Sequence, residues 1–270
     1  MAGSVDSILN QVRAEGVLLR RTWLLFRKDT GALVFGSPLI LLTFIPILWA
    51  FALLAVPIFH ADHKRANLTL VAVLVIGPTL CVLPLVGGHM GIAIRRVRDQ
   101  SSGKARQVFR GYRQFGDLSL ASIVVFAGFA LLVAVLWLAL PRSLWPLSSP
   151  LLLVGLPVVY LFPAIVDERL HVGPALRRSV TLLRGAELWR TLAAAITYLL
   201  LAYVLGLPSS LTHGALKTLL DAASGVLWIF AFAPLSVVYL VCMYFHAQGE
   251  DQLVESAIAG DEIHRAVSVT

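Results

Sequence analysis

The stretch GPALRRSVTLLRGAELWRT, residues Gly173–Thr191, contains four arginines and lies between two strongly apolar segments. The segment before it reads LLLVGLPVVYLFPAIV (Leu151–Val166), and the segment after it reads LAAAITYLLLAYVLGL (Leu192–Leu207). Basic residues between two long apolar runs are typical of a surface segment that joins two membrane-spanning helices. The rest of the chain is consistent with this interpretation.

The composition predicts a membrane protein with several spans. Of the 270 residues, 58% are hydrophobic and 14% are charged, and the mean hydropathy is +0.83. Soluble domains carry about 25% charged residues. The net charge of +7 would also suit a protein that binds nucleic acid, but the basic residues lie beside apolar runs. We therefore expect them to contact anionic lipid headgroups, and we expect no nucleic-acid partner. Cys81 and Cys242 fall inside apolar runs and are interpreted as buried apolar residues.

The apolar runs predict an all-α fold with six transmembrane helices. A bilayer core requires about 20 apolar residues per helix. The N-terminus lacks a short apolar core with a cleavage site, so we expect no removed signal peptide. The predicted spans are Leu33–Phe59, Leu68–Ile94, Leu118–Leu140, Pro150–Val166, Leu192–Leu211 and Gly225–Phe245.

The distribution of positive charge predicts the orientation of these spans. All of the 22 lysines and arginines fall on one side of the predicted bilayer except Lys64, Arg65, Arg142 and Lys217. Because cytoplasmic loops carry the excess of positive charge, both termini are predicted to be cytoplasmic.

Three segments repeat the pattern of two arginines seven residues apart, each just before an odd-numbered span. Residues seven apart lie on nearly one face of an α-helix, so each segment is predicted to be a basic amphipathic helix at the membrane interface. The chain is therefore interpreted as three tandem hairpins, residues 5–98, 99–172 and 173–250, each preceded by such a helix, with a short acidic tail at 251–270. All three form one membrane domain, residues 1–270. The arginine pairs are Arg20 with Arg27, Arg106 with Arg113, and Arg177 with Arg184.

The segment FPAIVDERLHVGPALRRSVTLLRGAELWRT, Phe162–Thr191, resembles a group of uncharacterised six-helix prokaryotic membrane proteins. This group includes the YciC-like proteins and the membrane domain attached to some glycerophosphodiester phosphodiesterases. The segments Arg20–Leu42 and Val108–Ile123 resemble the other two interfacial segments of the group. The resemblance implies a bacterial or archaeal cytoplasmic-membrane protein, and it carries over no catalytic or binding residues.

A few ionisable residues at the cytoplasmic ends of the even-numbered spans form a possible polar cluster. If the three repeats surround an axis, two imidazoles and a carboxylate could converge there, and such ligands suit zinc, iron or manganese. The alternative is that the two carboxylates pair with arginines of the neighbouring interfacial helix and that the histidines lie among headgroups. We favour this alternative and predict no metal and no cofactor. The residues are His89, Asp167, Glu168 and His246.

The sequence favours a non-enzymatic integral membrane protein, because we find no catalytic motif in it. The six paired arginines are predicted to bind anionic phospholipid or a protein partner, which could be a second copy of the chain. The alternative is a transporter or lipid-translocating protein with a cavity lined by the proline-broken even-numbered helices. A membrane enzyme that uses the histidines and Glu168 is the third alternative.

Overall fold

The computed structural model describes residues 2–59, 77–99, 103–125, 127, 159–185, 187–194, 196–197, 204 and 213–268. Within these residues the chain is helical and contains no strand, which confirms the all-α prediction for the described part. Residues 115–125 and 187–194 are also helical. The named elements are α1 (Ala2–Lys28), α2 (Thr30–Phe59), α4 (Gly77–Asp99), η2 (Ala105–Gln114), α6 (Leu161–Glu168), α7 (Val172–Leu182), α9 (Gly214–Leu227), η4 (Trp228–Phe232), α10 (Ala233–Ala247) and α11 (Asp251–Ser268).

Among the described residues, two helices are long and apolar enough to cross a membrane, Thr30–Ala50 and Leu216–Ala247. They correspond to the first and sixth predicted spans. The second to fifth predicted spans fall partly or largely outside the described residues. The structure therefore confirms a helical fold with two helices that could cross a membrane, and the six spans stay a prediction. The core helix of a soluble protein can have the same length and composition, but such a helix is mostly buried. In this structure only 22% and 28% of the apolar stretches of the two helices is buried.

Large apolar side chains on both long helices face outward. Exposed apolar residues of this size and number are unusual on a soluble surface, where contiguous apolar patches stay small. On α2 they include Phe35, Leu42, Ile45 and Trp49, and on α9 they include Leu216, Leu219 and Val226.

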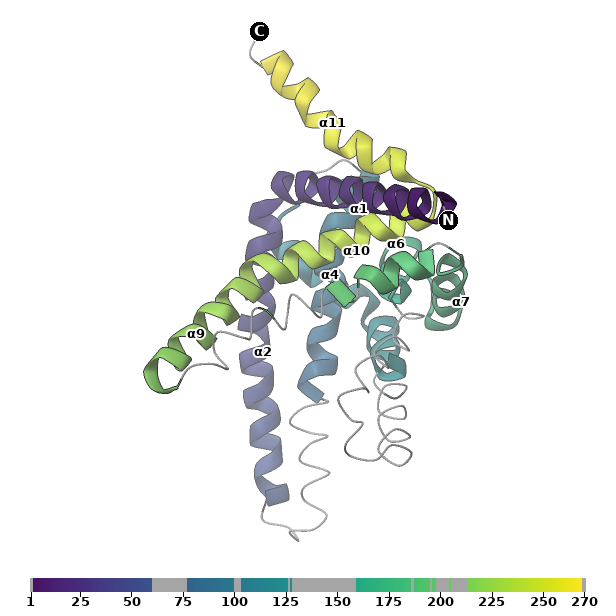
Figure 1. The fold of residues 1–270 in the computed structure, drawn as a ribbon. Coiled ribbons are helices and arrows are strands. Elements are labelled where there is room, and N and C mark those ends of the chain that lie inside the picture. The colour runs from purple at the N-terminus through teal and green to yellow at the C-terminus, as the bar shows by residue number, and fades with distance from the viewer. Residues whose placement is uncertain are drawn as a thin grey trace.

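The first helix, α1, lies across the ends of α2 and α4, and α10 runs beside it (Figure 1). The hydrophobic core lies at this end of the molecule, where α1, α4, α6 and α10 meet. Its largest fully buried side chains include Tyr160, Tyr244, Phe245, Leu25 and Leu85. This compact end therefore carries the tertiary contacts from which the candidate sites are built.

The corner between α1 and α2 is fixed by a buried carboxylate. Asp29 lies between the two helices, and its backbone carbonyl accepts the Leu33 N–H that begins α2. The Asp29 side chain accepts a hydrogen bond from the Gly103 N–H at 3.1 Å and lies 3.8 Å from Arg96 Nε on α4. Because Asp29 and Arg96 are both buried, each charge compensates the other.

The second basic segment is not the α-helix that the arginine spacing predicts. It is the 3₁₀-helix η2, with about 3.0 residues per turn, so Arg106 and Arg113 lie about a third of a turn apart rather than on one face. The segment packs closely on α4: a Cβ atom on Gly111 would lie 1.7 Å from the Pro84 carbonyl, and one on Gly88 would lie 1.7 Å from the Val108 carbonyl. Glycine at positions 88 and 111 therefore permits the close packing of η2 on α4.

The third basic segment also departs from the prediction, because α7 ends at Leu182 and Arg184 lies beyond it. Gly185 adopts a φ of 65°, in the left-handed region that glycine enters without a steric penalty. The chain turns there and becomes helical again at residue 187. Only the first segment, within α1, carries both of its arginines on one continuous α-helix.

The acidic tail forms α11 and packs on α1. Arg21 donates to Asp251 at 2.6 Å and also forms an ion pair with Glu255. Val254 and Ala257 on α11 are buried. In the structure the acidic tail therefore contacts a basic helix of the same chain.

Candidate functional site

The six paired arginines are exposed in the structure. Among the described residues, none of them forms a hydrogen bond or ion pair. Arginines next to them in the sequence behave differently: Arg21 pairs with α11, Arg178 pairs with Glu168, and Arg190 pairs with Glu15 at 3.0 Å. The chain thus separates arginines that hold the fold together from arginines available to a ligand. The six paired arginines are Arg20, Arg27, Arg106, Arg113, Arg177 and Arg184, and Arg110 and Arg169 are likewise exposed without a described partner.

The two carboxylates of the possible polar cluster bind arginines. Asp167 accepts two hydrogen bonds from Arg98 at the end of α4. Glu168 accepts hydrogen bonds from Arg178 on α7, from the Tyr244 hydroxyl at 2.7 Å and from Gln248 at 2.8 Å. These contacts join the ends of α4, α6, α7 and α10.

The structure does not bring the two histidines to these carboxylates. His89 is buried, and its Nε2 lies 2.9 Å from the Leu33 carbonyl of α2, so Nε2 carries the proton. On α10, Tyr244 and Gln248 lie four residues apart on one face and reach Glu168, whereas His246 between them faces the other side. His246 Nδ1 lies 2.8 Å from Asp251. The three groups therefore do not converge on one metal position, and no group of three or more metal-ligating side chains is present among the described residues.

A cationic cleft lies where α4, η2 and the end of α6 meet, and its volume is about 750 Å³. Glycines of α4 and η2 form part of its wall, and Arg95, Arg110 and Arg113 line it. Burial lowers the pKa of Arg95, and the positive charges of Arg110 and Arg113 lower it further, against the opposing effect of Asp99. Arg98 and Arg169 also line the cleft, together with Asp99, Asp167 and Glu168, so five positive and three negative side chains share this volume.

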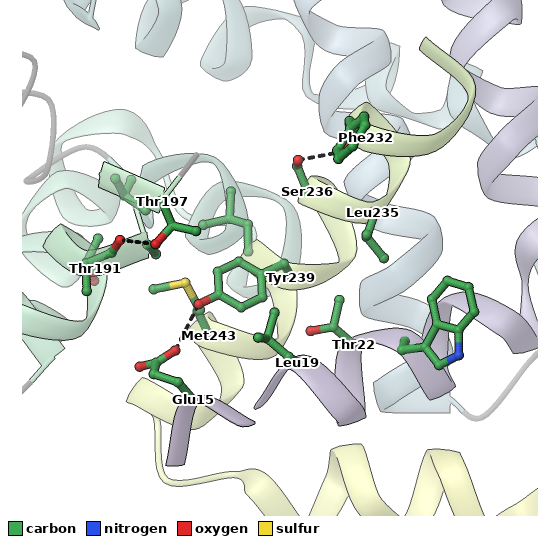
Figure 2. A pocket seen from close by; sticks show the side chains of 15 residues that line it. Glu15, Leu19, Thr22, Thr191, Thr197, Phe232, Leu235, Ser236, Tyr239 and Met243 are labelled. Atoms are coloured by element: carbon green, nitrogen blue, oxygen red, sulfur yellow. Dashed lines mark hydrogen bonds between the residues drawn. The ribbon is translucent and has the colours of Figure 1, made fainter. Parts of the chain in front are cut away.

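A second cavity, of about 420 Å³, is lined mainly by apolar side chains of α1, α10 and the helical segment at 187–194 (Figure 2). At one end Glu15 accepts a hydrogen bond from the Tyr239 hydroxyl at 3.1 Å. Phe232 and Ser236 lie on its wall, at the junction between the π-helical turn η4 and α10. The π-helical turn η4 changes the spacing of the backbone hydrogen bonds in this helix. Pro234, at the start of α10, has no N–H to donate to that pattern.

Comparison of the chain with protein-family models, with curated proteins and with solved structures gives no match. The resemblance to six-helix prokaryotic membrane proteins therefore stays a prediction, and the functional argument rests on the chain's own residues.

Sequence reasoning missed two parts of the site. Arg95 and Arg110 were interpreted only as signals of orientation, although the glycine pair in VGGHMG was a sign that another backbone packs against α4 there. The apolar cavity gave no sequence signal, because α1, residue 159, the segment around 191–197 and α10 come together only in the folded chain.

Proposed function

We propose that this protein is an integral membrane protein of the cytoplasmic membrane that binds anionic phospholipid through its exposed arginines. In this proposal the chain spans the bilayer six times, with both termini and the three basic segments on the cytoplasmic side. The outward-facing apolar side chains of α2 and α9 support burial of these helices in lipid, since lipid tails replace the protein core that would otherwise cover them.

The observation that carries the proposal is that six exposed arginines have no carboxylate partner among the described residues. Exposed aromatic side chains accompany them: Trp23 in the first segment, Tyr112 in the second and Trp189 after the third. Tryptophan and tyrosine favour the headgroup region, where their rings and their polar atoms are both accommodated. Basic and aromatic residues together are therefore typical of a helix surface that contacts headgroups.

The lipid preference can be measured by native mass spectrometry of protein released from nanodiscs that contain equal amounts of phosphatidylglycerol and phosphatidylcholine. The native chain should retain more phosphatidylglycerol than phosphatidylcholine. Each cation near an anionic surface contributes about 1 kcal/mol, so the double variant Arg177→Glu with Arg184→Glu loses about 2 kcal/mol and should lower this enrichment about 30-fold. Lys217→Glu, on the side predicted to be outside, is the control. Equal retention of the two lipids by the native chain would exclude the proposal.

The apolar cavity supports a second candidate function, the binding and translocation of an apolar or lipid substrate. Its volume and its largely apolar wall with a few polar groups are typical of small-molecule sites. It also lies against α10, the sixth predicted span, next to the irregular turn that precedes Pro234. This function requires the cavity to be open, whereas lipid binding at the arginines does not.

Filling the cavity tests this second function. Ala194→Trp and Ser236→Phe each place a large side chain on the cavity wall, and Ala222→Phe on exposed α9 is a control outside it. The measurement is the rate at which purified protein in liposomes moves a fluorescent phospholipid between leaflets. The native chain and the control should accelerate this movement, and the two cavity variants should not. No acceleration by the native chain would exclude lipid translocation as the function.

A further inference from the structure

The cationic cleft shares Arg113 with the six exposed arginines, but its charges are held in one concave space. Arg95 follows the predicted second span directly on α4, whereas Arg110 and Arg113 lie on η2. The close approach of these two elements depends on Gly88 and Gly111, whose missing side chains allow backbone to touch backbone. The sequence thus uses two glycines to bring arginines from two separate elements together.

Two of the three acidic residues that line the cleft are paired with arginines. Asp167 is held by Arg98, which also pairs with Glu250 at 2.8 Å, and Glu168 is held by Arg178. Asp99 is the remaining carboxylate in the lining. Among the described residues, therefore, Arg95, Arg110 and Arg113 share the cleft with one uncommitted carboxylate and with Arg169, which also has no described partner.

The hydrogen-bonding capacity of these arginines is largely unused. Arg95 donates from Nη2 to Gln107 at 3.1 Å, but its buried Nε has no hydrogen-bond partner among the described residues. Arg110 and Arg113 make no hydrogen bond or ion pair with the described residues. Arg110 and Arg113 are exposed, so their guanidinium groups are free to donate hydrogen bonds to a ligand in the cleft, whereas the Nε of Arg95 is covered by protein atoms.

We infer that the cleft binds the phosphate group of a small phosphate ester, with Arg95, Arg110 and Arg113 as its ligands. The planar guanidinium group donates two parallel hydrogen bonds to a phosphate and matches its geometry. A tetrahedral phosphate offers acceptors in several directions at once, which suits three arginines that come from two elements. The volume of about 750 Å³ leaves room for the alcohol part of the ester.

The position of the cleft favours a lipid headgroup as the source of the phosphate. The assignment to a lipid rests on the proposed function, because it requires the cleft to lie at the membrane surface. Arg95 begins where the predicted second span ends at Ile94, at the depth where headgroup phosphates lie. Phosphate binding itself does not depend on the membrane and can be measured in a neutral detergent.

The test is isothermal titration calorimetry of the full chain in a non-ionic detergent. The probes are inorganic phosphate and dihexanoyl phosphatidic acid below its micelle concentration. Binding with one site per chain is the expected result, and a charge-assisted hydrogen bond of about 1.5 kcal/mol or more predicts at least a tenfold weaker affinity for Arg110→Gln. Arg95→Lys, which retains the charge but lacks the guanidinium fork, should also weaken binding.

Lys104→Gln removes one positive charge from an exposed side chain just before η2, outside the cleft, and should leave the affinity unchanged within twofold.

Tighter binding of phosphatidic acid identifies a lipid as the source, and equal binding of both probes identifies a free phosphate. Absence of binding, or equal affinities for native chain and Arg110→Gln, overturns the inference. A chain that retains phosphatidylglycerol in nanodiscs but binds neither probe would refute the cleft alone. A chain that binds phosphate without lipid selectivity would refute the proposed function alone.

Discussion

Arg98 on α4 and Asp167 at the end of α6 form a two-point salt bridge, with Nε 3.0 Å from Oδ1 and Nη2 2.7 Å from Oδ2. The hydrogen bonds that Arg98 donates to Asp167 outweigh the burial of Arg98 and raise the pKa of its guanidinium above the usual value. The guanidinium carbon also lies 4.8 Å from the centre of the Phe245 ring on α10. This one arginine thus ties together three elements beside the cationic cleft.

Asp167→Asn should destabilise the protein, because the Asp167 side chain is only 5% exposed and its loss of charge leaves Arg98 with weaker acceptors. Hydrogen bonds to charged groups contribute about 2 kcal/mol, which corresponds to a melting temperature about 5 °C lower. The melting temperature in detergent is the measurement. Asp221→Asn, an exposed residue on α9 without a described partner, should leave it within a degree. Equal melting temperatures for the two variants would mean that the salt bridge adds no stability.

Two glycine-to-alanine substitutions should have opposite effects. A Cβ atom at Gly88 would lie 1.7 Å from the Val108 carbonyl, so Gly88→Ala forces α4 away from η2. Such overpacking costs about 1–3 kcal/mol. In the helical segment at 115–125, no other part of the described chain comes within 4 Å of the Cβ position of Gly116, and Gly116→Ala should stabilise the helix by about 0.5–1 kcal/mol.

Thermal unfolding of both glycine variants checks these opposite signs. A stable Gly88→Ala protein would show that the two elements can separate without cost. In that case, phosphate affinity in the same variant would reveal whether the cleft depends on the close approach.

The fold elements that could be predicted from sequence are those set by local composition. The long apolar runs predicted helices at Leu33–Phe59 and Gly225–Phe245, and the structure has α2 at Thr30–Phe59 and a continuous apolar helix at Leu216–Ala247. Long apolar segments favour helices because all their backbone hydrogen bonds are then made internally. Glu168 also pairs with Arg178 of the following helix, as one of the two alternatives for the polar cluster expected.

The contacts that could not be predicted depend on tertiary structure. Asp167 pairs with Arg98, 69 residues away, rather than with a nearby arginine. The spacing of Arg106 and Arg113 predicted an α-helix, but the close packing of Gly111 on Pro84 accompanies a 3₁₀-helix instead. Sequence spacing carries no information about which distant backbone packs against a segment, and this packing determines where the arginines of the cleft lie.

The predicted orientation can be tested by cysteine labelling in whole cells. In a background with Cys81→Ala and Cys242→Ala, single cysteines are introduced as Thr181→Cys on α7 and Lys217→Cys on α9, both at exposed positions. The excess of positive charge places Thr181 inside and Lys217 outside. A membrane-impermeant maleimide should therefore label Lys217→Cys in intact cells and Thr181→Cys only after permeabilisation. Labelling of both in intact cells would contradict the six-span topology.

The contact between α11 and α1 should depend on the charge of Arg21, which pairs with Asp251 and Glu255. Arg21→Glu places three acidic residues together and should detach the start of α11, while the burial of Val254 and Ala257 opposes detachment. Because these side chains are partly exposed, we expect a loss of about 1 kcal/mol, or about fivefold faster amide hydrogen exchange at residues 251–259.

Adding Glu255→Arg to Arg21→Glu restores an opposite-charge pair and should recover part of the protection. Arg20→Glu, at the adjacent exposed position without a described partner, is the matched control and should leave exchange unchanged. If Arg20→Glu and Arg21→Glu accelerated exchange equally, the general charge of α1 would hold the tail rather than this ion pair.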